Sequence, residues 1–261
     1  MMKDKRIVRD VLSIEGVRIL AMLGMLIGAM LLFLPCILVG IDHPDSLAAA
    51  AGGEVIVCLA LYVILKKKGM MAQNPFSVAP LLRFGGLIAI TAAAYVLRCV
   101  FWMIAGGTVG IEYNTRSLGG YLLFAFLFSV MNGLCLDVFG IQHLQRRGYT
   151  EREIVIAFVC LDLLYGILDV FLRPTGTGML ANPAVWMTLL AAGIEYALMV
   201  LLFIRSRSIL GRVLISFLNL VITPFGQRYT LGLWLVDVLF CACLALALFK
   251  LIRTGGKEKT A

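Results

Sequence analysis

Six acidic residues lie inside long apolar runs of this sequence, where an ionised carboxylate is costly. They are Glu54, Asp137, Asp162, Asp169, Glu195 and Asp237, and only Arg98 is a base at comparable depth. A centrally placed acid costs roughly 2.5–3.5 kcal/mol on membrane-insertion scales, so it usually faces the interior of a helix bundle or a water-filled cavity. Carboxyl groups held in such places can bind protons or cations, and this is the chemistry that the residue types favour.

The stretch "CLDLLYGILDVFLRP" holds two of these acids, Asp162 and Asp169, seven residues apart. Seven residues make nearly two helical turns, so both side chains share one face, about 10 Å apart along the axis. Arg173 follows Asp169 by four residues and is placed to pair with it at the rim. Asp162 then needs a donor on a neighbouring helix, a proton or a cation. Simple hydrogen bonding to hydroxyls or amides across helices is the alternative for this residue.

Depth along the apolar runs sorts the remaining candidates. Asp162 and Glu195 lie nearest the expected midplane, and Asn219 lies at similar depth. Glu54 and Asp237 fall in the outer third together with Arg98, so we expect Arg98 to be paired with one of them. Asp137 and Asp169 lie close to interfaces and are interpreted as solvated. The predicted substrate- or ion-binding residues are Asp162, Glu195, Arg98, Asn219, Glu54 and Asp237.

The composition indicates which elements must position these residues. Apolar residues make up 61% of the 261 residues and charged residues 15%, against roughly 45–50% and about 25% in soluble domains. An all-α integral membrane protein is therefore predicted, with 1–261 forming a single polytopic domain. About eight helices of about 20 residues fit this length. The expected spans are 18–40, 47–65, 84–106, 119–142, 154–172, 185–204, 209–225 and 230–250, after an amphipathic leader over 1–16 that lies on the membrane surface.

The basic residues predict the orientation of the spans. All but four of the 23 lysines and arginines fall on one side if both termini lie inside the cell, as the positive-inside rule requires. Trp102, Trp186 and Trp234 then lie near the outer surface as an aromatic belt. We expect a multi-pass protein of a bacterial inner membrane with cytoplasmic N- and C-termini.

Several functions are excluded or disfavoured by the residues present. The net charge of +8 is interpreted as contact of inner loops with the lipid bilayer and its anionic headgroups rather than with nucleic acid. The two histidines, His43 and His143, lie on opposite sides and no HExxH motif occurs, so neither a zinc site nor a catalytic residue is predicted. No cofactor is expected, and the sequence resembles no family.

An internal duplication is suggested by similar motifs. "AAGGE" ends at Glu54 and "AAGIE" ends at Glu195, while Asp137 and Asp237 follow similar Gly-Leu runs. A tandem four-plus-four repeat around a central site would suit a transporter. The unequal spacings between the paired motifs argue against such a repeat.

Three functions remain open from the sequence. A small carrier that uses buried acids for proton or cation coupling is favoured by the excess of acids over bases. The first alternative is a membrane subunit, such as an ATP-driven permease or an assembly factor, whose basic inner loops dock a cytoplasmic protein partner. The second alternative is a lipid-modifying membrane enzyme in which Arg98 and the outer acids form a site.

Overall fold

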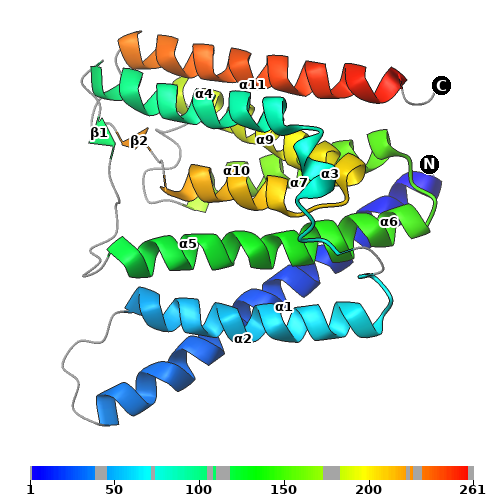
Figure 1. Cartoon of the computed structure of the whole chain (residues 1–261), viewed down its shortest axis with the longest axis vertical. Coiled ribbons are helices and arrows are strands. Elements are labelled where there is room, and N and C mark those ends of the chain that lie inside the picture. The colour runs from blue at the N-terminus through cyan, green and yellow to red at the C-terminus, as the bar shows by residue number, and fades with distance from the viewer. Residues whose placement is uncertain are drawn as a thin grey trace. The chain divides into compact units, whose positions relative to one another are not determined.

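The chain is almost entirely helical in the computed structural model, which describes residues 2–38, 46–71, 74–104, 108–109, 118–172, 183–221, 224–225 and 231–257 (Figure 1). The two-residue strands β1 (Thr108–Val109) and β2 (Pro224–Phe225) pair antiparallel. The helices are α1 (Met2–Leu38), α2 (Ser46–Lys67), α3 (Ala79–Leu82), α4 (Gly85–Ile104), α5 (Leu118–Asn132), the π-helix η1 (Gly133–Ile141), α6 (Gln142–Arg146), α7 (Glu151–Leu172), α9 (Pro183–Ser206), α10 (Leu210–Val221) and α11 (Leu231–Lys257).

Six helical segments within the described residues are long and apolar enough to cross a membrane. Each overlaps one of the expected spans, so the prediction of several membrane-spanning helices is supported at these six places. The segments are Arg6–Leu34, Ala49–Lys67, Gly85–Ile104, Gly119–Arg146, Val185–Ser206 and Leu231–Arg253.

The two other expected spans, 154–172 and 209–225, coincide with α7 and α10. Helix α7 has 22 residues, enough to cross, but it carries charged residues in its first turn and acids further along. Helix α10 has only 12 residues and rises about 18 Å at 1.5 Å per residue, less than the roughly 30 Å of a bilayer core. The number of eight crossings therefore stays a prediction.

The N-terminal segment differs from the expected surface leader. Residues 2–38 form one continuous helix, α1, so the leader and the first span are not separate. Asp10, Val11, Ile14 and Glu15 are buried, which an amphipathic helix lying on a membrane does not require. The Asp10 carboxylate accepts hydrogen bonds from the Arg147 guanidinium at 2.6 Å and the Tyr149 hydroxyl at 3.1 Å. These bonds tie the start of α1 to the loop after α6.

The helices group into two compact units, and the chain passes between them several times. Unit 1 contains α1, α2, α5 with η1 and α6, and α10, whereas unit 2 contains α3, α4, α7, α9 and α11. Neither unit is a sequential half of the chain. The halves of the four-plus-four repeat that the similar motifs suggest therefore do not coincide with the compact units.

Small residues bring α1 and α2 together in unit 1, where the two helices cross (Figure 1). A Cβ atom added to Gly53 would lie 2.4 Å from the Met25 carbonyl oxygen, and one added to Gly28 would lie 3.0 Å from the Gly53 Cα. Glycine is needed at both positions because any side chain would push the two backbones apart. This close crossing buries the part of α2 that carries Glu54.

In unit 2, α9 packs against both α7 and α11, and α11 also packs along α4 (Figure 1). Gly166 of α7 faces α9, since a Cβ atom at that position would lie 2.5 Å from Leu189 Cδ2. The start of α7 is a capping box, in which Thr150 and Glu153 each accept a hydrogen bond from the other's backbone N–H. The Thr150 backbone N–H donates to the Glu153 carboxylate at 2.7 Å, and the Glu153 N–H donates to the Thr150 hydroxyl at 3.3 Å.

Candidate functional site

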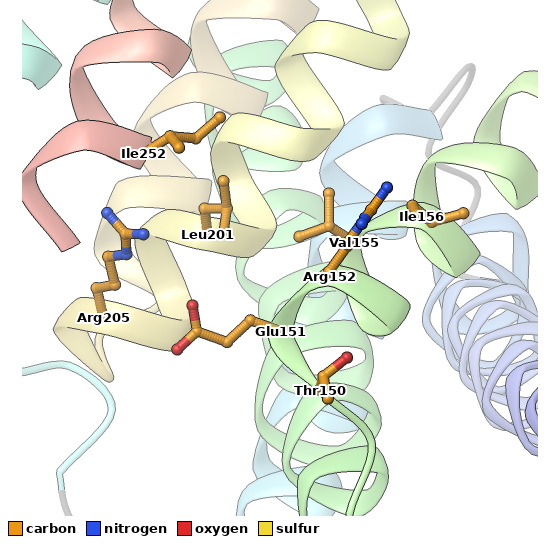
Figure 2. A pocket seen from close by; sticks show the side chains of 8 residues that line it. All are labelled: Thr150, Glu151, Arg152, Val155, Ile156, Leu201, Arg205 and Ile252. Carbon is orange, nitrogen blue, oxygen red and sulfur yellow. The ribbon is translucent and has the colours of Figure 1, made fainter. Parts of the chain in front are cut away.

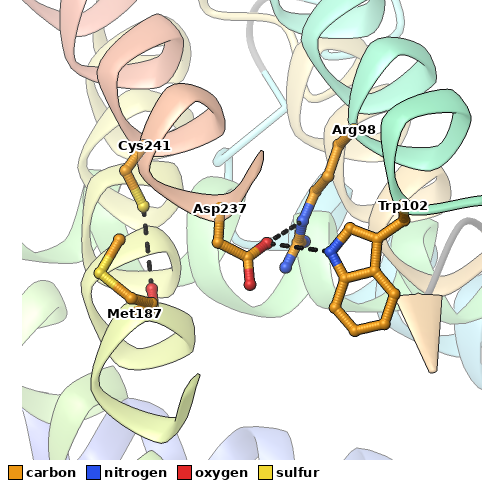
Figure 3. Close-up of polar contacts among 5 residues, drawn as sticks. All are labelled: Arg98, Trp102, Met187, Asp237 and Cys241. Atoms are coloured by element: carbon orange, nitrogen blue, oxygen red, sulfur yellow. Dashed lines mark hydrogen bonds and ion pairs between the residues drawn. The ribbon is translucent and has the colours of Figure 1, made fainter. Parts of the chain in front are cut away.

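The centre of the candidate site is an ion pair between Arg98 of α4 and Asp237 of α11 (Figure 3). Arg98 Nε lies 2.9 Å from Asp237 Oδ1, and the two side chains are 11% and 5% exposed. The Trp102 indole Nε1–H donates to the same carboxylate oxygen at 3.4 Å. Because a buried charge is tolerated only when it is paired and hydrogen-bonded, these contacts explain how the two charges persist between apolar helices.

Aromatic rings surround this ion pair on the same faces of the two helices. The Arg98 guanidinium lies 4.5 Å from the centre of the Phe240 ring, a favourable cation–π distance. The Phe240 ring meets the Tyr95 ring edge-on at 5.1 Å. Tyr95, Arg98 and Trp102 recur at helical spacing, so α4 presents all three to α11.

Two further acids extend the cluster onto the other long helices of unit 2. Glu195 of α9 is 4% exposed and interacts electrostatically with Arg98 and with Asp162 of α7. Fully buried Tyr95 also interacts with Glu195, although its hydroxyl does not meet strict hydrogen-bond geometry with any described residue. Asp162 itself is half-buried. Helices α4, α7, α9 and α11 thus each contribute at least one charged group.

The structure brings together four of the six residues that the sequence singles out. Arg98, Asp162, Glu195 and Asp237 all lie in unit 2. The prediction that Arg98 pairs with an acid is confirmed, and the partner is Asp237. Trp102, expected in an outer aromatic belt, is instead 5% exposed and hydrogen-bonded. The side chain of Asp169, and Arg173 with it, lie outside the described residues.

The other two predicted residues, Glu54 and Asn219, lie in unit 1. Glu54 is fully buried in α2, and neither of its carboxylate oxygens has a hydrogen-bond partner among the described residues. Burying an unpartnered ionised carboxylate is far more costly than burying the neutral acid. Asn219 is an exposed residue of α10, and its place in a binding site stays a prediction.

A second buried ion pair, between Asp137 and Arg212, was not predicted. Arg212 Nε of α10 lies 2.7 Å from Asp137 Oδ1 of η1, and the side chains are 2% and 0% exposed. The interpretation of Asp137 as a solvated interfacial acid is therefore wrong. Gly133, at the start of η1, permits the close approach, because a Cβ atom there would lie 3.1 Å from Ile209 Cβ, next to α10.

The π-helical conformation around Asp137 is itself a functional signal. The π-helix is uncommon and often occurs at functional sites, where its wider turn redirects side chains. Eight of its nine residues are buried, so the aspartate is held in a dry environment with its arginine. The glycines that flank it in "GLCLDVFG" were the only available signal in the sequence.

Metal chemistry is not indicated by the described residues. Within them, no group of three or more His, Cys, Asp or Glu side chains is arranged to hold a metal ion. In comparisons with known proteins, no family model, curated protein or solved structure matches this chain. The fold and the site define the class of protein only as a helical protein with several apolar helices compatible with a membrane.

Proposed function

We propose that the protein is a small membrane carrier whose coupling group is the charged cluster of unit 2. The observation that carries this proposal is a chain of charged contacts that holds three acids and one arginine. Arg98 pairs with Asp237 and interacts with Glu195, which in turn interacts with Asp162. If all were ionised, the cluster would hold two negative charges in excess. Such an excess among apolar helices is costly, and uptake of protons or small cations would relieve it.

The members of the cluster have different roles in this proposal. Asp237 is engaged by Arg98 and Trp102 and acts as the fixed counter-ion. Glu195 interacts at once with Tyr95, Arg98 and Asp162, so its charge state affects these three groups. We assign proton or cation binding to Glu195 together with Asp162. Glu54 in unit 1 would either stay protonated throughout the transport cycle or take up a proton in addition to the one bound at the unit 2 cluster.

The proposed topology is that of the sequence prediction. The whole chain forms one polytopic domain with eight crossings, including α7 and the short segment 209–225, in a bacterial inner membrane. Both termini face the cytoplasm, where the basic inner loops contact anionic lipid headgroups. Single-cysteine labelling in intact cells tests this arrangement. Modification at Gly256 by an impermeant reagent would place the C-terminus outside and leave seven crossings.

Titration of the purified protein tests the proposed function without knowledge of the substrate. Thermal stability is measured from pH 5 to 9 in sodium, potassium and choline buffers for the wild type, Glu195→Gln and Asp162→Asn. The proposal predicts that the wild type responds to pH or to one cation and that both variants lose part of this response. Identical curves for all three proteins would contradict it.

A membrane subunit that docks a cytoplasmic protein is the second candidate. It is favoured by exposed basic residues at adjoining helix ends and loops of unit 1. The loops are held in defined positions, since Arg146 donates to the Gly69 carbonyl and Arg207 to Gln145. Charge reversal at Lys67 and Lys68 would then release a co-purifying ATPase or assembly partner, while the pH response of the cluster would remain. The exposed basic residues are Lys66, Lys67, Lys68, Arg146, Arg147 and Arg207.

A further inference from the structure

A cavity of about 570 Å³ lies at the end of unit 2 where α7 begins and α9 ends (Figure 2). Its size is within the range of roughly 300–1,000 Å³ that is usual for small-molecule sites. One part of the lining is apolar and the other part is charged or polar. The apolar residues are Val155, Ile156, Leu201 and Ile252, and the polar residues are Thr150, Glu151, Arg152 and Arg205.

In the proposed membrane topology, the cavity lies at the boundary between hydrocarbon and headgroups. Arg205 lies one residue before the end of the apolar segment Val185–Ser206, and Ile252 one residue before the end of Leu231–Arg253. The arginines of the lining therefore lie where a membrane changes from acyl chains to headgroups. Ile156 and Ile252 are 50% and 52% exposed, so the apolar wall is open at its side, where the proposed membrane would supply acyl chains.

The charges of the lining favour an anion. The lining contains two positively charged guanidinium groups, from Arg152 and Arg205, and one negatively charged carboxylate, from Glu151. Figure 2 shows the Glu151 carboxylate turned to the side of Arg205 and the Arg152 side chain extended along Val155 and Ile156. Arg205 is anchored by a hydrogen bond that it donates to the Leu251 carbonyl, which leaves further donors of its guanidinium for a ligand. Planar guanidinium groups bind phosphate oxygens in pairs, with directional hydrogen bonds.

We propose that this cavity binds one anionic phospholipid, with its phosphate bound by Arg205 and by the exposed Arg152 side chain after it turns toward the ligand, and with an acyl chain against Leu201 and Ile252. An anionic lipid satisfies both parts of the lining at once, and it can enter sideways from the bilayer. The site is independent of the proposed coupling cluster. Binding at the cavity would stabilise the packing of α7, α9 and α11.

Lipid binding is measured on the full chain in detergent by native mass spectrometry and by the thermal shift on addition of phosphatidylglycerol or phosphatidylcholine. Phosphatidylglycerol is expected to bind with preference and to raise the melting temperature of the wild type. Arg152→Gln with Arg205→Gln should weaken its binding about tenfold or more, since two charge-assisted contacts are lost. Glu151→Gln should strengthen binding. Arg253→Gln removes an exposed base of α11 that does not line the cavity; it is the matched control and should leave binding unchanged.

Four outcomes would overturn the proposal. The first is an unchanged phosphatidylglycerol preference in the double variant, and the second is an equal loss in the Arg253 control, which would show a diffuse surface effect. If the double variant does not fold, Arg152→Lys with Arg205→Lys keeps the charges but not the paired donors, and it should show intermediate binding; wild-type binding by this variant would contradict the assigned geometry. Competition by glycerol phosphate at the concentration of the lipid would identify a free phosphate site and refute the lipid.

Discussion

Arg212 and Asp137 form an ion pair at 2.7 Å in which the side chains are only 2% and 0% exposed. Removing one partner of such a pair leaves an uncompensated buried charge, which costs roughly 3–5 kcal/mol. Arg212→Gln is therefore expected to lower the melting temperature and the folded yield sharply. Thermal unfolding in detergent, followed by circular dichroism, is the measurement.

The matched control for this pair is the double change Asp137→Leu with Arg212→Met. Replacing both charges by apolar side chains of similar size is often neutral or stabilising, so stability should return towards the wild type. If the double variant is as unstable as Arg212→Gln, the loss comes from the packing around η1 and not from an unpaired charge.

The ion pair of unit 2 gives a second prediction. Arg98 and Trp102 both donate to Asp237, and we expect Arg98 to contribute more to stability. Arg98→Gln removes the ion pair with Asp237 and should lower stability by about 3 kcal/mol or more. Trp102→Phe removes one long hydrogen bond of 3.4 Å and should cost only about 1 kcal/mol. Comparing both melting temperatures checks the order, and a larger effect of Trp102→Phe would contradict the assignment of Arg98 as main partner.

The crossing of α1 and α2 gives a third prediction. Gly53→Ala places a Cβ atom 2.4 Å from the Met25 carbonyl oxygen, so one backbone must move and the variant should be destabilised by about 1–3 kcal/mol. Gly16→Ala is the control, since nothing lies within 4 Å of a Cβ atom there, and a helical alanine is favoured over glycine by roughly 1 kcal/mol. Equal stability of the two variants would show that the helices do not approach so closely.

The cluster of unit 2 could be predicted in large part from the sequence. A lone arginine in an apolar run needs an acid, and Asp237 was one of two acids at its depth. Glu195 and Asp162 were selected because their positions lie near the centre of apolar runs. Both arguments depend on the cost of burying a charge, which limits where a charged residue can lie and what it can pair with. This limit can be derived without a structure.

The pair in unit 1 could not be predicted because it depends on local geometry that periodicity does not report. The depth of Asp137 was derived from a regular α-helix, whereas the segment is a π-helix with a wider turn. Arg212 was counted with the inner-loop bases because it follows Arg205 and Arg207 closely. In the structure α10 begins at Leu210, so Arg212 lies in its first turn and reaches Asp137.

The exposure of Asn219 has a related origin. The apolar run 209–225 was treated as one span, and its middle was therefore assigned to the membrane interior. The helix ends at Val221, so Asn219 lies near its end rather than at its centre. Apolar composition alone does not distinguish a full crossing from a short helix packed against its neighbours.

The most direct test of the account is charge movement driven by a pH or cation gradient in proteoliposomes. The wild type, Glu195→Gln, Asp162→Asn and Asp169→Asn are reconstituted at equal folded yield, and currents are recorded on a solid-supported membrane with a panel of metabolites and ions. Asp169→Asn is the control on the same helix as Asp162, because the sequence predicts that Asp169 pairs with Arg173 at the rim, where an exposed pair contributes only about 0–1 kcal/mol. The account predicts gradient-dependent currents in the wild type and in Asp169→Asn and their loss in Glu195→Gln and Asp162→Asn. Full currents in Glu195→Gln, or loss in Asp169→Asn alone, would contradict it.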